Sequence, residues 1–229
     1  MAARTSFVGR VTKIAAYAVL VVLCIFAGLL VLYSFAPPVS TLMLGRTLTG
    51  KSYERTYVPL KDVAPVLVAS VIASEDAQFC RHGGVDWGAL RKVLDEAGED
   101  GPSRGASTIT MQTAKNLFLW PGRSRLRKGL EIGMALVLGK VWSRAHTLEV
   151  YLNIAEWGDG LFGIEAAARH YFQKRASQLN PREAALLATS LPNPILRNAA
   201  RPRPFHSRLA ARIAARARGS YEWLDCVPR

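Results

Sequence analysis

The chain has 229 residues, of which 50% are hydrophobic, and it carries 30 Lys and Arg against 17 Asp and Glu, a formal net charge of +13. This length allows a substantial core, and the excess of positive charge indicates an anionic partner: nucleic acid, an acidic membrane surface or a phosphorylated substrate. Three cysteines without CxxC or CxxxH spacing argue against a disulfide framework and a structural zinc site. We expect Cys80 and Cys226 to be free thiols, although an oxidising compartment would allow a disulfide between them.

An uninterrupted apolar stretch without a charged residue occupies positions 14–36, and it is long enough to cross the roughly 30 Å of hydrocarbon in a bilayer. Basic residues precede this stretch, whereas the apolar core of a cleaved signal peptide is usually only about 7–15 residues long. We therefore predict a cytoplasmic basic N-terminus (1–13) and an uncleaved transmembrane anchor (14–36), with the rest of the chain outside the cytoplasm. This topology argues against nucleic acid and favours lipid headgroups and lipid-linked phosphates.

Beyond the anchor we expect a connector (37–62), with a short strand near 53–58, and one domain (63–229). Apolar residues in this domain recur at helical spacing and β-branched residues seldom alternate, so we predict a mainly α fold. Pro, Gly and Asn mark turns at 120–122 and 157–160, a polar loop at 98–105 and a helix start at Asn180-Pro181. Helices are predicted at 63–75, 87–97, 106–119, 127–142, 146–155, 163–172, 181–191 and 205–223.

Two adjacent carboxylates, Glu75 and Asp76, follow the apolar run 66–73. Apolar neighbours bury a carboxyl group in part, and burial raises its pKa toward a value that is useful in acid/base chemistry. The simpler alternative is a helix that ends at a polar turn, with both acids solvated.

Small and hydroxyl-bearing residues lead into the predicted helix 106–119. The first amide groups of such a helix are free to meet an anion, and Lys115 lies about two turns beyond Ser107. Ordinary N-capping by Ser107 or Thr108 is the alternative. The apolar patch 117–120 at the other end is either buried core or a segment that inserts into the membrane interface.

Four cations then precede a single carboxylate, Glu131. Arg127 and Glu131 are four residues apart, so they share a helix face and can pair. A solvated basic face is the alternative, but an acid surrounded by cations also fits a site for a phosphate ester. The cations are Arg123, Arg125, Arg127 and Lys128.

Taken in order, these clusters resemble the motifs of the peptidoglycan glycosyltransferases (glycosyltransferase family 51), over about residues 60–200. The monofunctional members are the most similar, because the chain has no SxxK or KTG sequence for a transpeptidase. Met111 departs from the family pattern, which commonly has glutamine there. The motifs are Glu75-Asp76 with Phe79, His82, Gly84 and Asp86; Gly105 with Ser107-Thr108-Ile109-Thr110, Gln112 and Lys115-Asn116; Arg127-Lys128 with Glu131; Tyr151-Leu152-Asn153; and Glu183-Ala184-Ala185-Leu186-Leu187-Ala188.

The resemblance implies a lysozyme-like helical catalytic domain behind one transmembrane helix. It implies a bacterial enzyme of the cytoplasmic (inner) membrane, with its catalytic domain on the periplasmic face. Members of this family join lipid II units through β-1,4 bonds by inverting glycosyl transfer and release undecaprenyl pyrophosphate. The implied partners are lipid II, the lipid-linked glycan strand, the membrane and other cell-wall synthesis proteins. A divalent cation (Mg²⁺ or Mn²⁺) is implied by family behaviour alone.

The resemblance also assigns roles to particular residues. Glu75 matches the catalytic base and Glu131 the second family glutamate near the donor phosphates. The remaining implied residues fall into three groups: Lys115, Arg123, Arg127 and Lys128 bind the donor pyrophosphate; Gln112, Ser107 and Thr108 line the cleft; Asp76, Phe79, His82 and Asp86 support the loop after Glu75.

Two other functions compete with this hypothesis. A lytic transglycosylase or lysozyme-type hydrolase would share the fold type and an essential glutamate, but it has no need of cations that bind pyrophosphate. A non-catalytic, membrane-tethered module would use the same cations to bind anionic lipid and would not need Glu75.

Overall fold

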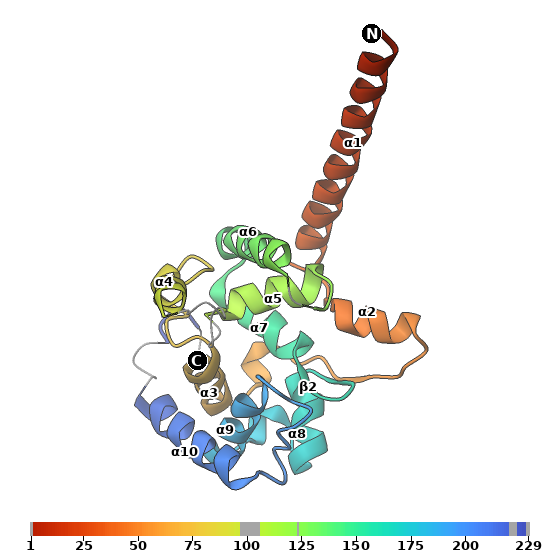
Figure 1. Cartoon of the computed structure of the whole chain (residues 1–229). Coiled ribbons are helices and arrows are strands. Elements are labelled where there is room, and N and C mark those ends of the chain that lie inside the picture. The colour runs from red at the N-terminus through yellow and green to blue at the C-terminus, as the bar shows by residue number, and fades with distance from the viewer. Residues whose placement is uncertain (1, 97–105, 123, 220–223, 228–229) are drawn as a thin grey trace. The chain divides into compact units, whose positions relative to one another are not determined.

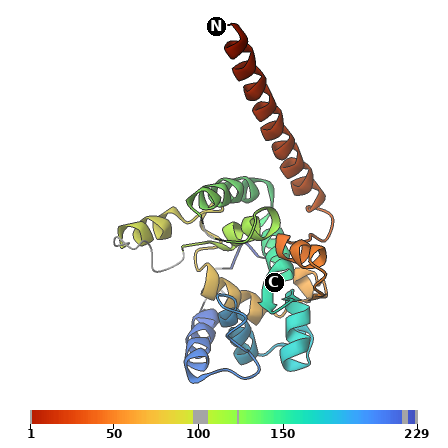
Figure 2. The ribbon, with the colours of Figure 1, turned by 45° about the vertical axis from the view of Figure 1, so that its right-hand side comes forward.

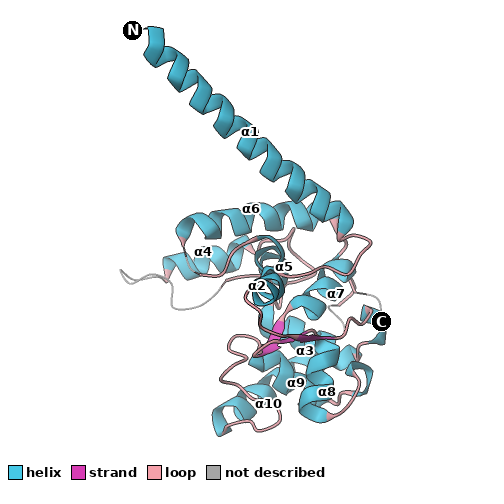
Figure 3. Cartoon of the chain, turned by 90° about the vertical axis from the view of Figure 1, so that its right-hand side faces the viewer, coloured by secondary structure: helices cyan, strands magenta, loops and turns pink. Residues whose placement is uncertain are grey.

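The structure is a computed structural model that describes residues 2–96, 106–122, 124–219 and 224–227, apart from the side chains of 2–8 and Leu94. It divides into two compact units, Met1–Pro37 and Pro38–Arg229. Helices dominate both units, so the prediction of a mainly α fold is confirmed (Figures 1 and 3). The helices are α1 (Ala2–Leu32), α2 (Thr41–Leu48), α3 (Pro65–Glu75), α4 (Trp87–Asp95), α5 (Ile109–Phe118), α6 (Arg125–Val141), α7 (Arg144–Ile154), α8 (Ile164–Phe172), α9 (Pro181–Ser190) and α10 (Pro204–Gly219).

The first unit consists mainly of α1. Its segment Gly9–Leu32 has 24 residues and a mean hydropathy of 2.9, so it is long and apolar enough to cross a membrane. The helix ends earlier than the predicted stretch 14–36, because residues 33–36 form a turn that closes on the carbonyl groups of Leu29, Val31 and Leu32.

Helix α2 lies within the stretch predicted as a connector, and that prediction missed it. Ser40 caps the helix by accepting a hydrogen bond from the Met43 amide at 3.2 Å, and Met43 is fully buried. Thr41 donates to the carbonyl of Leu119 at 2.8 Å, beyond the end of α5. The Gly and Thr residues of this segment have low helix propensity, so the sequence did not predict a helix that tertiary packing stabilises.

Helix α3 forms the centre of the second unit. Residues 67–72 are buried around the whole circumference of this helix, as expected of a helix that other elements cover on every side. Helices α9 and α10 pack against it, as Figures 1 and 2 show. The predicted start of α9 is confirmed: the side chain of Asn180 accepts from the Glu183 amide at 2.9 Å, and the Glu183 carboxylate accepts from the Asn180 amide at 3.0 Å.

A small sheet with strand order β1-β3-β2 ties the connector to the domain. Strand β1 (Glu54–Arg55) runs parallel to β3 (Leu161–Phe162), and β2 (Glu156–Gly158) runs antiparallel to it. The predicted strand near 53–58 is thus confirmed in part, whereas the predicted turn 157–160 belongs to a β-hairpin. Next to the sheet, the buried side chain of Asn153 accepts from the Val58 amide at 2.9 Å and donates to the Val58 carbonyl at 2.8 Å.

Two further features differ from the sequence-based expectations. Cys80 and Cys226 are joined in a disulfide, so the expectation of two free thiols is wrong. Helix α10 packs against α3, and both Cys80 and Cys226 pack against the core cluster, where these distant residues meet. In the patch 117–120, Leu117 and Leu119 are buried in the core and Trp120 is 52% exposed, so the patch is not one continuous membrane-facing surface.

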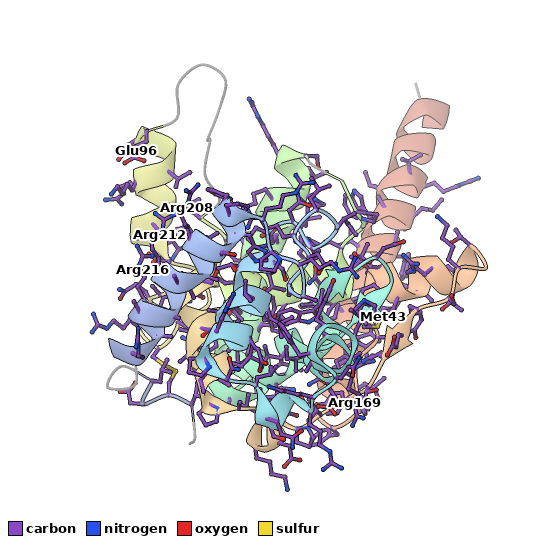
Figure 4. The ribbon with its side chains drawn as sticks, turned by 90° about the horizontal axis from the view of Figure 1, so that it is seen from below. Met43, Glu96, Arg169, Arg208, Arg212 and Arg216 are labelled. Atoms are coloured by element: carbon purple, nitrogen blue, oxygen red, sulfur yellow. A yellow bond between two sulfur atoms is a disulfide. The ribbon has the colours of Figure 1, made fainter. Side chains whose placement is uncertain are left out.

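Helix α10 shows its charge on one side only. Its buried side carries His206, Ala210, Ile213 and Ala217. Arg208, Arg212 and Arg216 project from the other side in a row at helical spacing, as Figure 4 shows. The row accounts for part of the net positive charge of the chain.

Gly84 holds the loop after α3 against α6. Its φ is +108°, and an added Cβ would lie 2.3 Å from the Ala135 carbonyl oxygen, whereas a Cβ on the neighbouring Gly83 would meet nothing within 4 Å. We expect Gly84→Ala to lower the free energy of unfolding by at least about 2 kcal/mol, because alanine is strained at this φ and clashes with backbone. Gly83→Ala is the matched control and should unfold like the wild type. Equal unfolding midpoints for the two variants would contradict this account.

Candidate active site

Glu75 is the last residue of α3 and is only partly exposed, just beyond the buried stretch 67–72. Its Oε2 accepts from the side-chain amide of Gln112 at 3.1 Å, and its Oε1 accepts from the Ser74 hydroxyl at 3.2 Å. The hydroxyl of the buried Tyr151 donates to Gln112 Oε1 at 3.1 Å. That hydrogen bond turns the amide NH₂ of Gln112 toward Glu75.

Burial raises the pKa of Glu75, and the hydrogen bonds from Gln112 and Ser74 lower it by a smaller amount. Two cations, Lys115 and Arg197, also lower it through their charge. The net direction is upward, as the apolar approach to this residue predicted, so the alternative of a solvated acid is wrong for Glu75. A carboxyl group with a raised pKa accepts a proton more readily than an ordinary one.

The loop after Glu75 is fixed by contacts within the protein. Asp76 Oδ2 accepts from the Ile109 amide at 2.9 Å, and Asp76 Oδ1 lies 2.8 Å from His82 Nε2. Phe79 is fully buried, with the guanidinium of Arg144 5.6 Å from its ring centroid. Asp86 accepts from the Ala89 amide at 2.9 Å at the start of α4. These contacts suit the supporting roles that the resemblance implied.

Helix α6 turns its charged side inward. Its buried residues are Arg127, Glu131, Ala135 and Leu138, spaced along one face. Glu131 Oε1 accepts from Lys128 Nζ at 2.8 Å, and Glu131 Oε2 lies 3.5 Å from Arg127 Nη1. A solvated basic face is therefore wrong for Arg127 and Glu131. Arg123 lies outside the described residues.

The start of α5 connects to this cluster. Ser107 accepts from Lys128 Nζ at 2.7 Å, so one ammonium group bridges Ser107 and Glu131. Thr108 is the N-cap of α5: it accepts from the Met111 amide at 3.1 Å and donates to the Gly84 carbonyl at 2.6 Å, and it is buried. The capping alternative thus describes Thr108, whereas Ser107 belongs to the charged cluster.

Lys115 lies within electrostatic range of both glutamates. Burial lowers its pKa first, and Arg127 and Lys128 lower it further, while Glu131 and Glu75 raise it. Lys115 and Arg127 line a cavity of about 270 Å³ formed by the start of α2, the end of α5 and the turn 120–122. Arg127 Nε is buried and has no hydrogen-bond partner among the described groups. An anion in this cavity would meet both cations.

A neighbouring face of α6, about 100° around the helix from the charged one, is apolar and exposed. This face, which we call the outer stripe, comprises Leu126, Leu130, Val137 and Val141, each at least 40% exposed. The apolar residues Leu130, Met134, Leu138 and Val141 recur at helical spacing, close to one face of this helix. Only Leu138 of these four is fully buried, because the charged residues occupy the inner face instead.

Resident metal binding has little support from these residues. Among the described residues, the one group of three potential ligands is Cys80, Asp225 and Cys226, whose two cysteines are joined as a disulfide. Glu131 already pairs with two cations. These residues do not fit a protein-held divalent cation, so we derive no catalytic step through one.

Sequence reasoning missed three residues at this site. Tyr151 lies within a recognised motif, but its contact with Gln112 depends on the packing of α7 against α5. Arg197 follows the Pro192-Asn193-Pro194 turn and donates to the Thr189 carbonyl at 2.7 Å. Arg144 begins α7 and approaches Phe79 and Asp76. No local pattern marks these contacts, because each joins segments that are distant in sequence.

A proton-accepting carboxylate next to a buried cluster of cations defines a helical enzyme site suited to transfer from a phosphate-linked donor. The transglycosylase family model matches residues 42–217. A biosynthetic peptidoglycan transglycosylase of Brucella melitensis biotype 1 is 56% identical over 91% of this chain and 95% of its own length. Proteins of the same name from Agrobacterium fabrum and Rhodopseudomonas palustris are 55% and 49% identical, over 84% and 92% of this chain and 85% and 94% of their own lengths.

The chain therefore belongs to the transglycosylase family, and its resemblance to the peptidoglycan glycosyltransferases is confirmed.

The two glutamates should respond oppositely to replacement by the isosteric amide. The raised pKa of Glu75 means that its ionised form costs stability as pH rises through the folded pKa, so Glu75→Gln should unfold at or above the wild-type temperature at pH 7. Glu131→Gln leaves Arg127 and Lys128 without their partner and should lower the free energy of unfolding by about 3 kcal/mol. Thermal and denaturant unfolding check both values. A Glu75→Gln protein whose unfolding temperature lies well below that of the wild type would contradict the raised pKa assigned to Glu75.

Proposed function

We propose that this chain polymerises lipid II into β-1,4-linked glycan strands of peptidoglycan and releases undecaprenyl pyrophosphate. The observation that carries the proposal is the position of Lys115, within range of both Glu75 and Glu131 and lining the cavity with Arg127. This arrangement supplies a base and, through Lys115, a cation-lined site for a leaving group within electrostatic range of it, as a single displacement requires.

In the proposed reaction, Glu75 takes the proton of the 4-hydroxyl group of the incoming disaccharide. The oxygen attacks the anomeric carbon of the lipid-linked donor, the bond from that carbon to the pyrophosphate oxygen breaks, and the configuration inverts. Lys115, Arg127 and Lys128 balance the charge on the departing pyrophosphate, together with Arg123, which lies outside the described residues. Glu131 keeps Lys128 and Arg127 in place rather than reacting itself.

The alternatives fit this site less well. A hydrolase or lytic enzyme acting within a glycan has no use for buried cations beside the base. A lipid-binding module without catalysis gives no reason for a buried carboxyl group oriented by Gln112 and Tyr151.

The proposed setting is the outer face of the bacterial cytoplasmic (inner) membrane, with α1 as a single-pass anchor. The apolar segment of α1 and the basic residues before it support this topology. The outer stripe of α6 supports insertion of the catalytic unit into the membrane surface, because apolar side chains normally face the core and here face outward. Cell-wall synthesis proteins are proposed as further partners.

Replacement of Glu75 by Gln tests the chemistry. The amide cannot accept the hydroxyl proton, so we expect the initial rate of lipid II polymerisation to fall by about 10²–10⁴-fold while lipid II still binds. Gel analysis of labelled lipid II incubated with the full chain gives the rate and the product. Digestion of finished peptidoglycan without polymerisation of lipid II would favour the lytic alternative, and lipid II binding without any polymerisation by the wild type would favour the binding module. An unaltered rate in the variant would rule out Glu75 as the base.

The pH profile of the wild type should be bell-shaped and narrow. The acid limb reports deprotonation of Glu75 and should lie above 4.5, because burial raises its pKa. The alkaline limb reports loss of the Lys115 charge and should lie below 10.5, because burial lowers its pKa. Lys115→Arg keeps its charge at high pH and should move only the alkaline limb upward. An unmoved alkaline limb in this variant would rule out Lys115 as its source.

The outer stripe can be tested by its dependence on a membrane. Leu126→Ser combined with Val137→Ser should lower kcat/KM several-fold for lipid II in vesicles, because about 1.5–3 kcal/mol of burial is lost per side chain that inserts. The rate with a short-chain, water-soluble lipid II analogue should stay unchanged. Ile195→Ser with Leu196→Ser is the matched control, since both residues are exposed but lie after α9. Equal losses with both substrates would contradict a membrane role.

A further inference from the structure

The Cys80–Cys226 disulfide fastens the loop after the base to the far end of the chain. Cys80 lies five residues beyond Glu75, and Cys226 lies 146 residues further along, with the two Cα atoms 5.5 Å apart. Figure 4 draws the bond in yellow near the end of α10. Cys226 also lies beyond residues 42–217, the part of the chain that the family model matches. The disulfide therefore joins a residue inside the matched part to one outside it.

The segment around Cys226 is a firm attachment point. Val227 is buried, and its amide donates to the Leu224 carbonyl at 3.1 Å. Leu224 and Cys226 pack against the main core cluster. Helix α10, which precedes this segment, packs on both α3 and α9. A covalent bond to Cys226 therefore holds Cys80 to the core rather than to a free chain end.

Packing is uneven in the loop: Phe79 is fully buried and Cys80 packs against the core cluster, whereas other residues of the loop are exposed. Residues 77–81 form turns, and Ala77 and Gln78 are exposed. A cavity of about 280 Å³ lies behind the loop, lined by Ala73, Ala77, Phe79, Cys80, Arg216 and Leu224 among others. Side chains next to a void lose part of the close packing that fixes position in a protein interior. Asp76 and Phe79 hold one side of the loop, and the disulfide spans the side that the cavity leaves open.

We infer that Cys80 and Cys226 are positioning residues for the transferase reaction: their disulfide holds the loop that follows Glu75, so that full activity requires the oxidised enzyme. This inference rests on the proposed function. The bond forms by thiol–disulfide exchange, in which an oxidant disulfide accepts two electrons and two protons from the two thiols and leaves as two thiols. Oxidants of this class act outside the cytosol, in agreement with the proposed topology.

The test uses the full chain in detergent, with lipid II as the substrate. We compare the oxidised wild type, the same protein after dithiothreitol, Cys226→Ser, and Cys24→Ser as the matched control, because Cys24 is an exposed free thiol outside the disulfide. We expect reduction or Cys226→Ser to lower kcat about tenfold with little change in KM, since small displacements of a reacting group are costly. Cys24→Ser should match the oxidised wild type before reduction and the reduced wild type after it, because it keeps the Cys80–Cys226 disulfide.

Two readouts separate positioning from simple stabilisation. The acid limb of the pH profile should shift to lower pH on reduction, because a loosened loop admits water to Glu75 and lowers its pKa. The other groups that act on this carboxyl group should stay in place: Lys115 from α5, Tyr151 from α7 and Arg197 after α9. Amide hydrogen exchange in residues 76–82 should speed up on reduction at a temperature where circular dichroism shows the fold intact. A lower unfolding temperature with unchanged kcat, pH profile and exchange would overturn the inference.

A failure of the proposed function can be distinguished from a failure of this inference. An oxidised wild type that does not polymerise lipid II refutes the proposed function, and the exchange measurement still decides whether the disulfide orders the loop. Thiol counting gives a further check: the denatured, unreduced protein should show one reactive thiol, and three would overturn the inference.

Discussion

The ion pairs of Glu131 determine how α6 is oriented, and much of the second unit follows from that orientation. A buried carboxylate needs cationic partners. Lys128 and Arg127 lie three and four residues from Glu131 on the same helix, so this face can turn inward with its charges paired. The apolar side chains of the same helix must then face outward. A single constraint thus gives the cleft its positive charge and leaves the outer stripe exposed. The same ammonium group that pairs with Glu131 also bonds Ser107, so the start of α5 is held by the cluster as well.

The site as a whole places charged groups where stability alone would not. Glu75 is buried enough for its pKa to rise, and Lys115 is buried enough for its pKa to fall. Each group is held partly out of water, where its charge interacts strongly with a neighbour or a substrate. Such positions cost folding free energy, and the fully buried helix α3 and its cover of α9 and α10 supply the compensating apolar contacts. Functional sites commonly show this exchange of stability for reactivity.

The sequence predicted the helices well where the signal was local. Asn180, Pro181 and Glu183 mark the start of α9 because capping involves only neighbours in the chain. Prediction from the sequence failed where tertiary packing decides the structure. Helix α2 is held by contacts of Thr41 and Met43, and the orientation of α6 follows its buried ion pairs rather than its hydrophobic spacing. The two glutamates and Lys115 were found through motifs, whereas Arg197 and the contact of Tyr151 with Gln112 were missed, because only the fold brings them to Glu75.

The environment of the base depends on parts of the chain that follow it by more than a hundred residues. Helix α3 ends at Glu75, and its neighbours on the other faces are α9, α10 and the segment that carries Cys226. Arg197 reaches Glu75 electrostatically from the stretch between α9 and α10, and Arg216 of α10 lines the cavity behind the loop. The buried cations Lys115 and Arg127 come from α5 and α6. Helix α5 links the two groups, because its Gln112 bonds Glu75 and its Lys115 acts on both glutamates. The Cys80–Cys226 disulfide lies outside this link and joins the loop after Glu75 to the end of the chain.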